Sequence, residues 1–232
     1  MKKALKNHYN KDYFEKRDHL DLHLAEALRI LMMENNLNSI LDVGCGTGQL
    51  INYLKKYGFK VAGNDISQEA IKRSPATIRK NIYNASATKL PFKEESLDLV
   101  TSISVIEHLT KKGRERFISE VSRVLKPKGY IFLVTPNWNS PFRYIQGKNW
   151  FAYSDPTHTH YYSPKTLAKQ LKSHGFKNIK FQFKTIYSPP YEWELPGILQ
   201  KLPRFAKSIL TYLLISTRFS FIRNSFWIAA QK

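Results

Sequence analysis

Three glycines at alternate positions, Gly44, Gly46 and Gly48, follow the apolar run Ser39–Val43 and precede a helical pattern. Glycine accepts a positive φ and lets the backbone approach a ligand, because it has no Cβ. The spacing G-x-G-x-G differs from the G-x-G-x-x-G of dinucleotide-binding turns, and Asp42 stands directly before it. A pyrophosphate would meet that negative charge, whereas ammonium and sulfonium groups would be attracted to it. The bend therefore predicts a site for a cation-bearing nucleoside.

A second acid, Asp65, ends the next predicted strand, 17 residues after Gly48. A carboxylate at a strand end can accept hydrogen bonds from both hydroxyls of a ribose. Hydrogen bonds to charged groups are worth about 1.5–3 kcal/mol. We therefore expect Asp65 to bind the sugar of the nucleoside.

Apolar runs alternate with helical patterns along the chain. The predicted strands are 39–43, 60–65, 78–84, 97–104, 130–135, 178–187 and 225–231. The predicted helices are 19–36, 49–57, a short helix between Ser67 and Pro75, 114–125 and 164–174. Strands separated by helices of this length imply βαβ units and a mostly parallel sheet between two layers of helices. Ligands bind such sheets at the carboxyl ends of the strands.

Composition limits the classes to consider. The 232 residues are 42% hydrophobic and 13% aromatic, which excludes global disorder and suits one large domain or a domain with an insertion. The single cysteine, Cys45, excludes a disulfide framework and a Cys-clustered metal site. No apolar run reaches the length of a membrane span, and the lysines at the N-terminus have no apolar core behind them. We expect a cytoplasmic protein.

The chain is strongly basic, with 37 Lys and Arg against 18 Asp and Glu, a net charge of +19. Residues 156–232 hold 12 of the basic residues and two acids, Glu192 and Glu194. An anionic partner such as nucleic acid, a phospholipid headgroup or a phosphorylated substrate would suit this region. The alternative is that dispersed lysines simply cover a solvated surface.

Four segments together resemble a known family. They are LDVGCGTG at 41–48, GNDIS at 63–67, ATKLPFKEESLDLVTSISVIEHL at 87–109 and EVSRVLKPKGYIFLVTPN at 120–137. Over about Ile40 to Phe176 the sequence resembles the class I S-adenosylmethionine (SAM)-dependent methyltransferases, within the group called methyltransferase type 11 or 12. The resemblance implies an α/β fold, a three-layer Rossmann-like seven-stranded sheet with one antiparallel strand, and SAM as cofactor.

The resemblance also implies positions for the cofactor contacts. They are Asp42, Gly44, Cys45, Gly46, Gly48 and Gln49 at the bend, Asp65 and Ile66 after the second strand, Ala87 and Thr88 at the adenine, and Ser102 and Ile103 at the end of the fourth strand. Where the family often has an acid for the adenine amine, this chain has Ser86. In the N-terminal segment 1–36, the aromatic residues around Tyr13 are interpreted as a lid with Tyr13 touching the cofactor.

Methyl transfer to a hydroxyl or amine requires removal of a proton, for which histidine is the usual base near neutral pH. His108 follows the fourth strand, and His158 and His160 follow the fifth, in a segment that covers the acceptor pocket in the resembling family. We take these three as candidate catalytic residues. Helix capping for His108 and solvated loop positions for the others are the alternatives. With no third ligand beside His158 and His160, no metal site is predicted.

Aromatic residues gather at about 136–163, which favours a lid over an apolar or ring-bearing acceptor, with ordinary loop packing as the alternative. They are Trp138, Phe142, Tyr144, Trp150, Phe151, Tyr153, Tyr161 and Tyr162. A basic amphipathic insertion at about 190–222 could lie in a lipid headgroup layer or dock on the core. The methyltransferase domain is expected over 37–232.

Three functions follow. The favoured hypothesis is a methyltransferase acting on a small or lipid-linked molecule, at oxygen. The second is an RNA or DNA methyltransferase, although Ser102–Val105 lacks the Asn/Asp-Pro-Pro-aromatic element that base-amine methylators use. The third is a peripheral-membrane protein that holds the cofactor without catalysis and contacts an anionic membrane.

Overall fold

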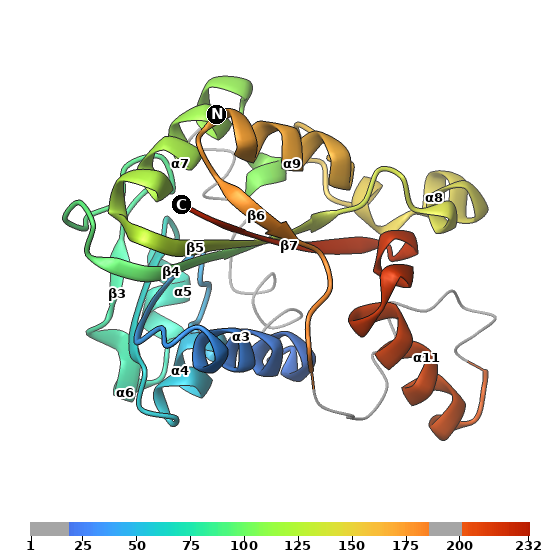
Figure 1. Ribbon diagram of the computed structural model, residues 1–232, viewed down its shortest axis with the longest axis horizontal. Helices are drawn as coiled ribbons and strands as arrows, with labels where there is room; N and C mark the ends of the chain where they lie inside the picture. Colours follow the sequence, from blue (N-terminus) through green and yellow to red (C-terminus); the bar gives the residue numbers. More distant parts are fainter. Residues whose placement is uncertain (1–18, 186–200) are drawn as a thin grey trace.

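A computed structural model of the chain describes residues 19–185 and 201–232. Its centre is a seven-stranded sheet with the order β3-β2-β1-β4-β5-β7-β6 (Figure 1). The strands are β1 Ser39–Val43, β2 Lys60–Asp65, β3 Ile82–Asn84, β4 Leu97–Ile103, β5 Leu125–Pro136, β6 Lys177–Lys180 and β7 Ser225–Gln231. All neighbouring pairs are parallel except those of β7, which runs antiparallel to both β5 and β6. The expected Rossmann-like α/β fold class is confirmed.

Helices cover both faces of the sheet. They are α3 Leu22–Glu34, α4 Gln49–Lys55, α5 Gln68–Arg73, α6 Ala76–Arg79, α7 Lys111–Val124, α8 Pro141–Gln146, α9 Pro164–Ser173 and α11 Arg204–Ser216. Short 3₁₀ turns are η1 Ile106–His108, η2 Gly147–Asn149, η3 Phe151–Tyr153 and η5 Arg218–Ile222. In Figure 1, α3 and α4 lie on one face of the sheet, and α7 and α9 lie on the other.

The hydrophobic core is divided by the sheet into two clusters. In β1, Ile40 packs into the cluster of α3 and α4, whereas its neighbour Leu41 packs into the cluster of α7 and α9. Successive side chains of a strand point to opposite faces. A strand covered on both faces is therefore apolar on both, which explains why Ile40, Leu41 and Val43 of β1 are all apolar and buried.

Three predicted strands differ clearly in extent from the observed ones. The predicted strand 178–187 corresponds to β6, which ends at Lys180, and residues 181–185 lie in no strand. Residues 78–81 are not in β3, because the chain after Pro75 forms α6, which buries Ile78. β5 begins at Leu125 rather than Tyr130, because the predicted turn over Lys126–Gly129 is a bulge within the strand. There the register shifts from the Leu97–Leu125 pair to the Leu99–Tyr130 pair, and Lys128 has a φ of 65°.

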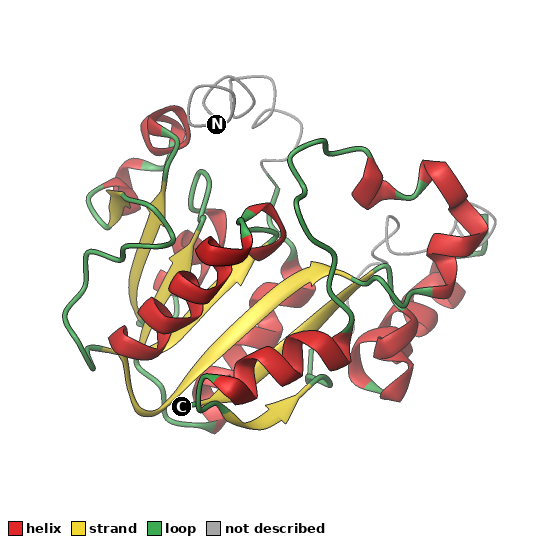
Figure 2. Ribbon diagram, turned by 90° about the horizontal axis from the view of Figure 1, so that it is seen from above, coloured by secondary structure: helices red, strands yellow, loops and turns green. Residues whose placement is uncertain are grey.

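The carboxyl ends of β1, β2, β4 and β5 share one edge of the sheet, at Val43, Asp65, Ile103 and Pro136. The chain beyond β5 forms a group of short helices at this end of the molecule (Figure 2). Asn137 and Ser140 tie that group to the segment before β7 through hydrogen bonds to the carbonyls of residues 221–223. No helix in the described ranges has the length and apolar character needed to cross a membrane.

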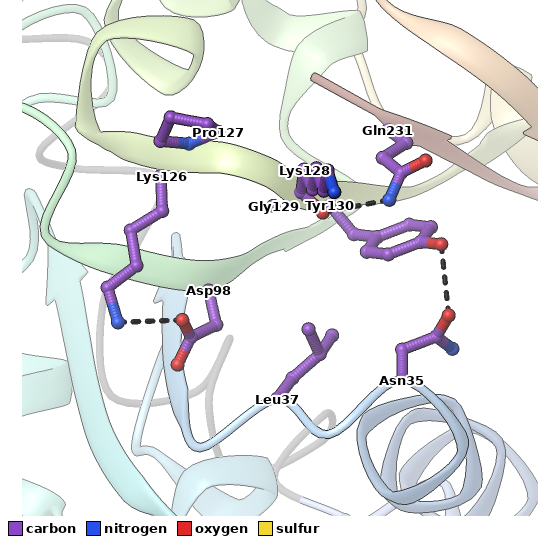
Figure 3. Close-up of a pocket in the computed structure, with 9 residues that line it drawn as sticks. All are labelled: Asn35, Leu37, Asp98, Lys126, Pro127, Lys128, Gly129, Tyr130 and Gln231. Atoms are coloured by element: carbon purple, nitrogen blue, oxygen red, sulfur yellow. Dashed lines mark hydrogen bonds and ion pairs between the residues drawn. The ribbon is translucent and has the colours of Figure 1, made fainter.

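A hollow lies at the opposite, amino-terminal edge of the strands (Figure 3). Four of the polar side chains that line it are paired with one another. Lys126 Nζ donates to Asp98 Oδ1 at 2.7 Å, and the Tyr130 hydroxyl donates to Asn35 Oδ1 at 3.0 Å. These four side chains therefore satisfy one another's hydrogen bonds.

Candidate active site

The glycine bend joins β1 to α4 at the carboxyl edge. The backbone amides of Gly44 and Cys45 both donate to the carbonyl of Asn64, at 2.8 and 3.1 Å. Gly44 has a φ of 76°, and a Cβ there would lie 2.3 Å from Cγ2 of Val105. Glycine is therefore required by both the backbone conformation and the contact. The contact also seats the chain that follows β4 directly on the bend.

Asp65 connects the bend to the end of β2. Its Oδ2 accepts from the Gly46 amide at 2.9 Å, and its Oδ1 accepts from the Ser67 amide at 2.8 Å. Burial raises the pKa of Asp65, although these two amides act in the opposite direction. Each carboxylate oxygen can accept more than one hydrogen bond. Asp65 is thus held in a fixed orientation and keeps accepting capacity for ligand hydroxyls.

Asp42 lies one residue before the end of β1 and is buried. Its Oδ1 has no hydrogen-bond partner within the described part of the chain. Burial, together with the charge of Asp65, raises the pKa of Asp42 to about 7. A buried, unpartnered carboxylate beside a second carboxylate favours a cationic ligand, which would relieve both desolvation and repulsion.

The other predicted cofactor residues differ in exposure. Ile66 is 44% exposed, as a side chain that stacks on a ligand ring would be. Ser102 Oγ donates to the Val43 carbonyl at 2.9 Å and holds β4 against β1. Ala87 packs into the core beneath α7, and Ile103 is half-buried against the opposite core.

Four further cofactor contacts were predicted, at Cys45, Thr88, Gln49 and Tyr13. Burial, with the charges of the two acids, raises the pKa of the Cys45 thiol well above its usual range, so this residue is no nucleophile. Thr88 lies beside Ser86, with their hydroxyl oxygens 3.0 Å apart. Gln49 is the first residue of α4. Tyr13 lies outside the described residues.

A hydrogen-bond chain links His108 to Asp155. The Thr157 hydroxyl donates to Asp155 Oδ1 at 2.5 Å and lies 2.7 Å from His108 Nδ1. A hydroxyl has one proton, so in this chain Nδ1 of His108 is the donor and Nε2 carries the lone pair. Burial opposes ionisation of Asp155, but hydrogen bonds from Thr157 and the nearby imidazoles lower its pKa to about 2. An ionised carboxylate therefore anchors the chain.

His158 lies beside His108, with ring centroids 4.6 Å apart. Its Nδ1 is 2.6 Å from the Ala152 carbonyl, which can only accept, so Nδ1 is protonated here too. Two imidazoles from distant parts of the chain thus have Nδ1 fixed as the donor. The structure brings together two of the three histidines chosen from sequence.

His160 is separate from that pair. Its ring lies edge-on against Tyr162, with centroids 4.5 Å apart, and burial together with the charge of Arg114 lowers its pKa. Its backbone amide donates to the Glu107 carbonyl at 3.2 Å. His160 therefore contributes to the packing of the segment.

Glu107 was not among the residues selected from sequence, although it directly precedes His108. It is fully buried, and burial raises its pKa to about 8. Oε2 accepts from the Thr135 hydroxyl at 3.1 Å, while Oε1 has no hydrogen-bond partner among the described residues. The signal for it was an acid directly after the apolar pair Val105 and Ile106, in the turn that follows β4.

The aromatic residues of 136–163 pack mainly on one another. Trp150 is fully buried and contacts the rings of Trp138, Phe151, Tyr153 and Tyr161, with centroids 5.1–6.4 Å away. Its indole N–H donates to Asn224 Oδ1 at 3.2 Å. This cluster surrounds η3, which carries the Ala152 carbonyl that orients His158. Loop packing around Trp150 is therefore part of what positions the histidine.

Residues 41–133 match the family model described as a methyltransferase domain. The match covers the acid-flanked glycine bend, β2, β4 and most of β5. Residues 41–133 thus carry a methyltransferase domain, which supports the class I SAM-dependent methyltransferase family that the sequence resembles. SAM is the cofactor of this family. All seven strands of the sheet belong to the methyltransferase fold.

Curated relatives resemble part of the chain. A ubiquinone biosynthesis O-methyltransferase of Bartonella bacilliformis is 30% identical over 151 residues, which are 60% of each chain. A 2-methyl-6-phytyl-1,4-hydroquinone methyltransferase of Synechocystis is 37% identical over 106 residues, 44% of this chain and 32% of that protein. This methyltransferase thus spans less than two thirds of the length of these relatives.

A crystal structure of a SAM-dependent methyltransferase from Archaeoglobus fulgidus has a TM-score of 0.61 and 22% identity to this chain. The structural alignment covers 90% of this chain and 94% of the Archaeoglobus chain. At this identity the likeness shows the fold, and it extends beyond the segment matched by the family model.

We predict that Asp42→Asn changes how stability depends on pH in the absence of SAM. Folding raises the pKa of Asp42 from 3.8 to about 7. The contribution of Asp42 to the free energy of unfolding is therefore full below about pH 4 and is lost as pH rises through 7. Relative to wild type, the variant should therefore gain about 1–3 kcal/mol between pH 5 and pH 8. Urea unfolding at both pH values measures this.

Asp98→Asn is the matched control for this measurement. Burial would raise the pKa of Asp98, but hydrogen bonds from Lys126 and Ser39 hold it below its usual range. Its titration window therefore lies below about pH 4, and the difference from wild type should stay constant from pH 5 to 8. A constant difference for Asp42→Asn as well would contradict the prediction.

Proposed function

We propose that this protein transfers a methyl group from SAM to a hydroxyl of a small or lipid-linked acceptor. One observation carries the proposal. Val105 packs against Gly44, so the turn that bears His108 lies directly on the acid-flanked glycine bend. Bound SAM supplies an electrophilic methyl group on a sulfonium. The work of the chain is then to hold that cation, orient the acceptor and take up its proton.

The residues of the bend suit a cationic nucleoside. Asp42 offers an unpartnered carboxylate oxygen to positive charge, and Asp65 offers an oriented carboxylate to ribose hydroxyls. Ile66 offers an exposed apolar surface to an aromatic base. Ser86, which is exposed, offers a hydroxyl where the resembling family often has an acid for the adenine amine.

The histidine pair suits removal of a proton from a hydroxyl. Because Nδ1 donates a hydrogen bond in both His108 and His158, Nε2 of each ring carries the lone pair. The charge of Asp155, transmitted through the Thr157 hydroxyl, stabilises the imidazolium that His108 becomes after accepting a proton. This arrangement resembles other base-orienter pairs and supports transfer to oxygen.

An apolar acceptor is supported by two observations. The curated relatives are named for ubiquinone biosynthesis and for a phytyl hydroquinone. Near the same end of the sheet, α8 exposes Tyr144 and Ile145, and α11 exposes Phe205 and Ile209. Exposed apolar side chains of this size mark contact surfaces for apolar partners.

SAM binding tests the proposal directly. Asp65→Ala should raise the Kd for SAM by about 10- to 100-fold, because it removes charge-assisted hydrogen bonds. Asp65→Asn keeps an oxygen that can accept from the Gly46 amide, so its Kd for SAM should lie between those of Asp65→Ala and wild type. Titration calorimetry measures the Kd, with Asp98→Asn at the opposite edge of the sheet as an unaffected control. Wild-type protein that does not bind SAM at millimolar concentration would refute the proposal.

The tautomer of His108 gives a test that needs no acceptor. Long-range ¹H–¹⁵N NMR of the neutral rings should show a proton on Nδ1 of both His108 and His158. Thr157→Val should move the His108 proton toward Nε2, because the acceptor of Nδ1 is lost, while His158 serves as the internal control. Thr157→Ser should restore the wild-type spectrum. An Nε2–H tautomer for His108 in wild type would disprove the hydrogen-bond chain.

Sedimentation with phospholipid vesicles tests the lipid-linked part of the proposal. The net charge of +19 and the exposed apolar residues of α8 and α11 predict pelleting with anionic vesicles and release as salt rises. Phe205→Ser should reduce the pelleted fraction several-fold. Tyr83→Ser, an equally simple loss of an exposed aromatic on β3, should not. Protein that stays in the supernatant at low salt would contradict membrane contact.

A further inference from the structure

Glu107, His108 and His158 form a cluster with the composition of a metal site. One ligand atom from each side chain lies within 4.8 Å of the other two. Two of the residues come from η1 and the third from a loop 50 residues later, so only the fold assembles them. Two imidazoles and one carboxylate are a recurrent ligand set for catalytic divalent metals.

Glu107 supplies the strongest evidence for a ligand. It is fully buried, and its Oε1 has no hydrogen-bond partner in the described part of the chain. Oε2 is held by the Thr135 hydroxyl, which fixes the orientation of the carboxyl group. A buried carboxylate oxygen without a partner is costly, whereas a bound cation would satisfy it.

The two histidines are oriented as metal ligands usually are. His108 Nδ1 donates to Thr157, which donates to the ionised Asp155, and His158 Nδ1 donates to the Ala152 carbonyl. Metal-binding histidines almost always donate the second ring N–H to a carboxylate or a carbonyl in this way. The arrangement leaves Nε2 as the ligand nitrogen of both rings.

We propose that Glu107, His108 and His158 bind one divalent transition-metal ion, for which Zn²⁺ suits the two-nitrogen, one-oxygen donor set. Ligand atoms around tetrahedral zinc are roughly 3.4 Å apart, and the three here lie within 4.8 Å of one another, so metal binding would draw them closer together. Three protein ligands leave a coordination position open to a further oxygen.

The role of the ion rests on the proposed function. An acceptor hydroxyl at the open position would lose its proton to water more readily, because the cation stabilises the oxyanion. The new O–CH₃ bond then forms as the S–CH₃ bond of SAM breaks. With the ion bound, the Nε2 lone pairs of both histidines are used as ligands, so water takes the proton in place of His108.

Metal binding is measured on tag-free, chelator-treated full-length protein without SAM or acceptor. Zn²⁺ titration should show one ion per chain, and Co²⁺ should give the visible ligand-field absorption of a site with nitrogen ligands. Glu107→Gln and His158→Asn should each weaken Zn²⁺ binding at least about 100-fold, since each removes a ligand. Thr157→Val should weaken it about 10-fold, because it removes only the orienting hydrogen bond.

His160→Asn is the matched control, since His160 lies in the same loop outside the cluster, and its Zn²⁺ affinity should equal that of wild type. Failure of wild type to bind Zn²⁺ at millimolar concentration, or equal affinities in all variants, would overturn the metal site. SAM titrations of the same samples separate the two proposals. Loss of Zn²⁺ binding with normal SAM binding defeats the metal site alone, while absence of SAM binding defeats the proposed function.

Discussion

The carboxylate of Asp65 is the interaction on which the site depends. It accepts from the Gly46 amide on one side and from the Ser67 amide on the other, so it ties the glycine bend to the end of β2. Asp42 is buried beside it, and burial together with the charge of Asp65 raises the pKa of Asp42 to about 7. Two acids in one buried region are costly unless a cation joins them. The fold therefore carries, at this edge, an electrostatic strain that a sulfonium nucleoside would relieve.

A second constraint holds the histidines to that edge. Val105 packs on Gly44, and two residues later the carbonyl of Glu107 accepts from the amides of Thr159 and His160. These backbone hydrogen bonds join the turn after β4 to the loop before α9. The turn that carries His108 and the glycine bend are thus held together, as the proposed positioning of acceptor and cofactor requires.

The two carboxyl groups near His108 differ in ionisation. Burial holds the carboxyl of Glu107 toward its neutral form, whereas hydrogen bonds keep Asp155 ionised. Two carboxyl groups on either side of the imidazoles therefore differ in charge because their environments differ, which is typical of sites that handle protons or metals. The aromatic packing around Trp150 stabilises the loop that completes this arrangement.

The sequence by itself determined the strands 39–43, 60–65 and 225–231, the glycine bend and the two acids at strand ends. These features depend on the periodicity of neighbouring residues and on backbone conformations that only glycine accepts. The tertiary structure decided the bulge in β5, the grouping of His108 with His158 rather than His160, and the place of Glu107 beside them. The Thr157–His108 bond joins residues 49 positions apart. Such contacts arise when separate strands deliver their ends to one edge of the sheet, and no local pattern encodes that meeting.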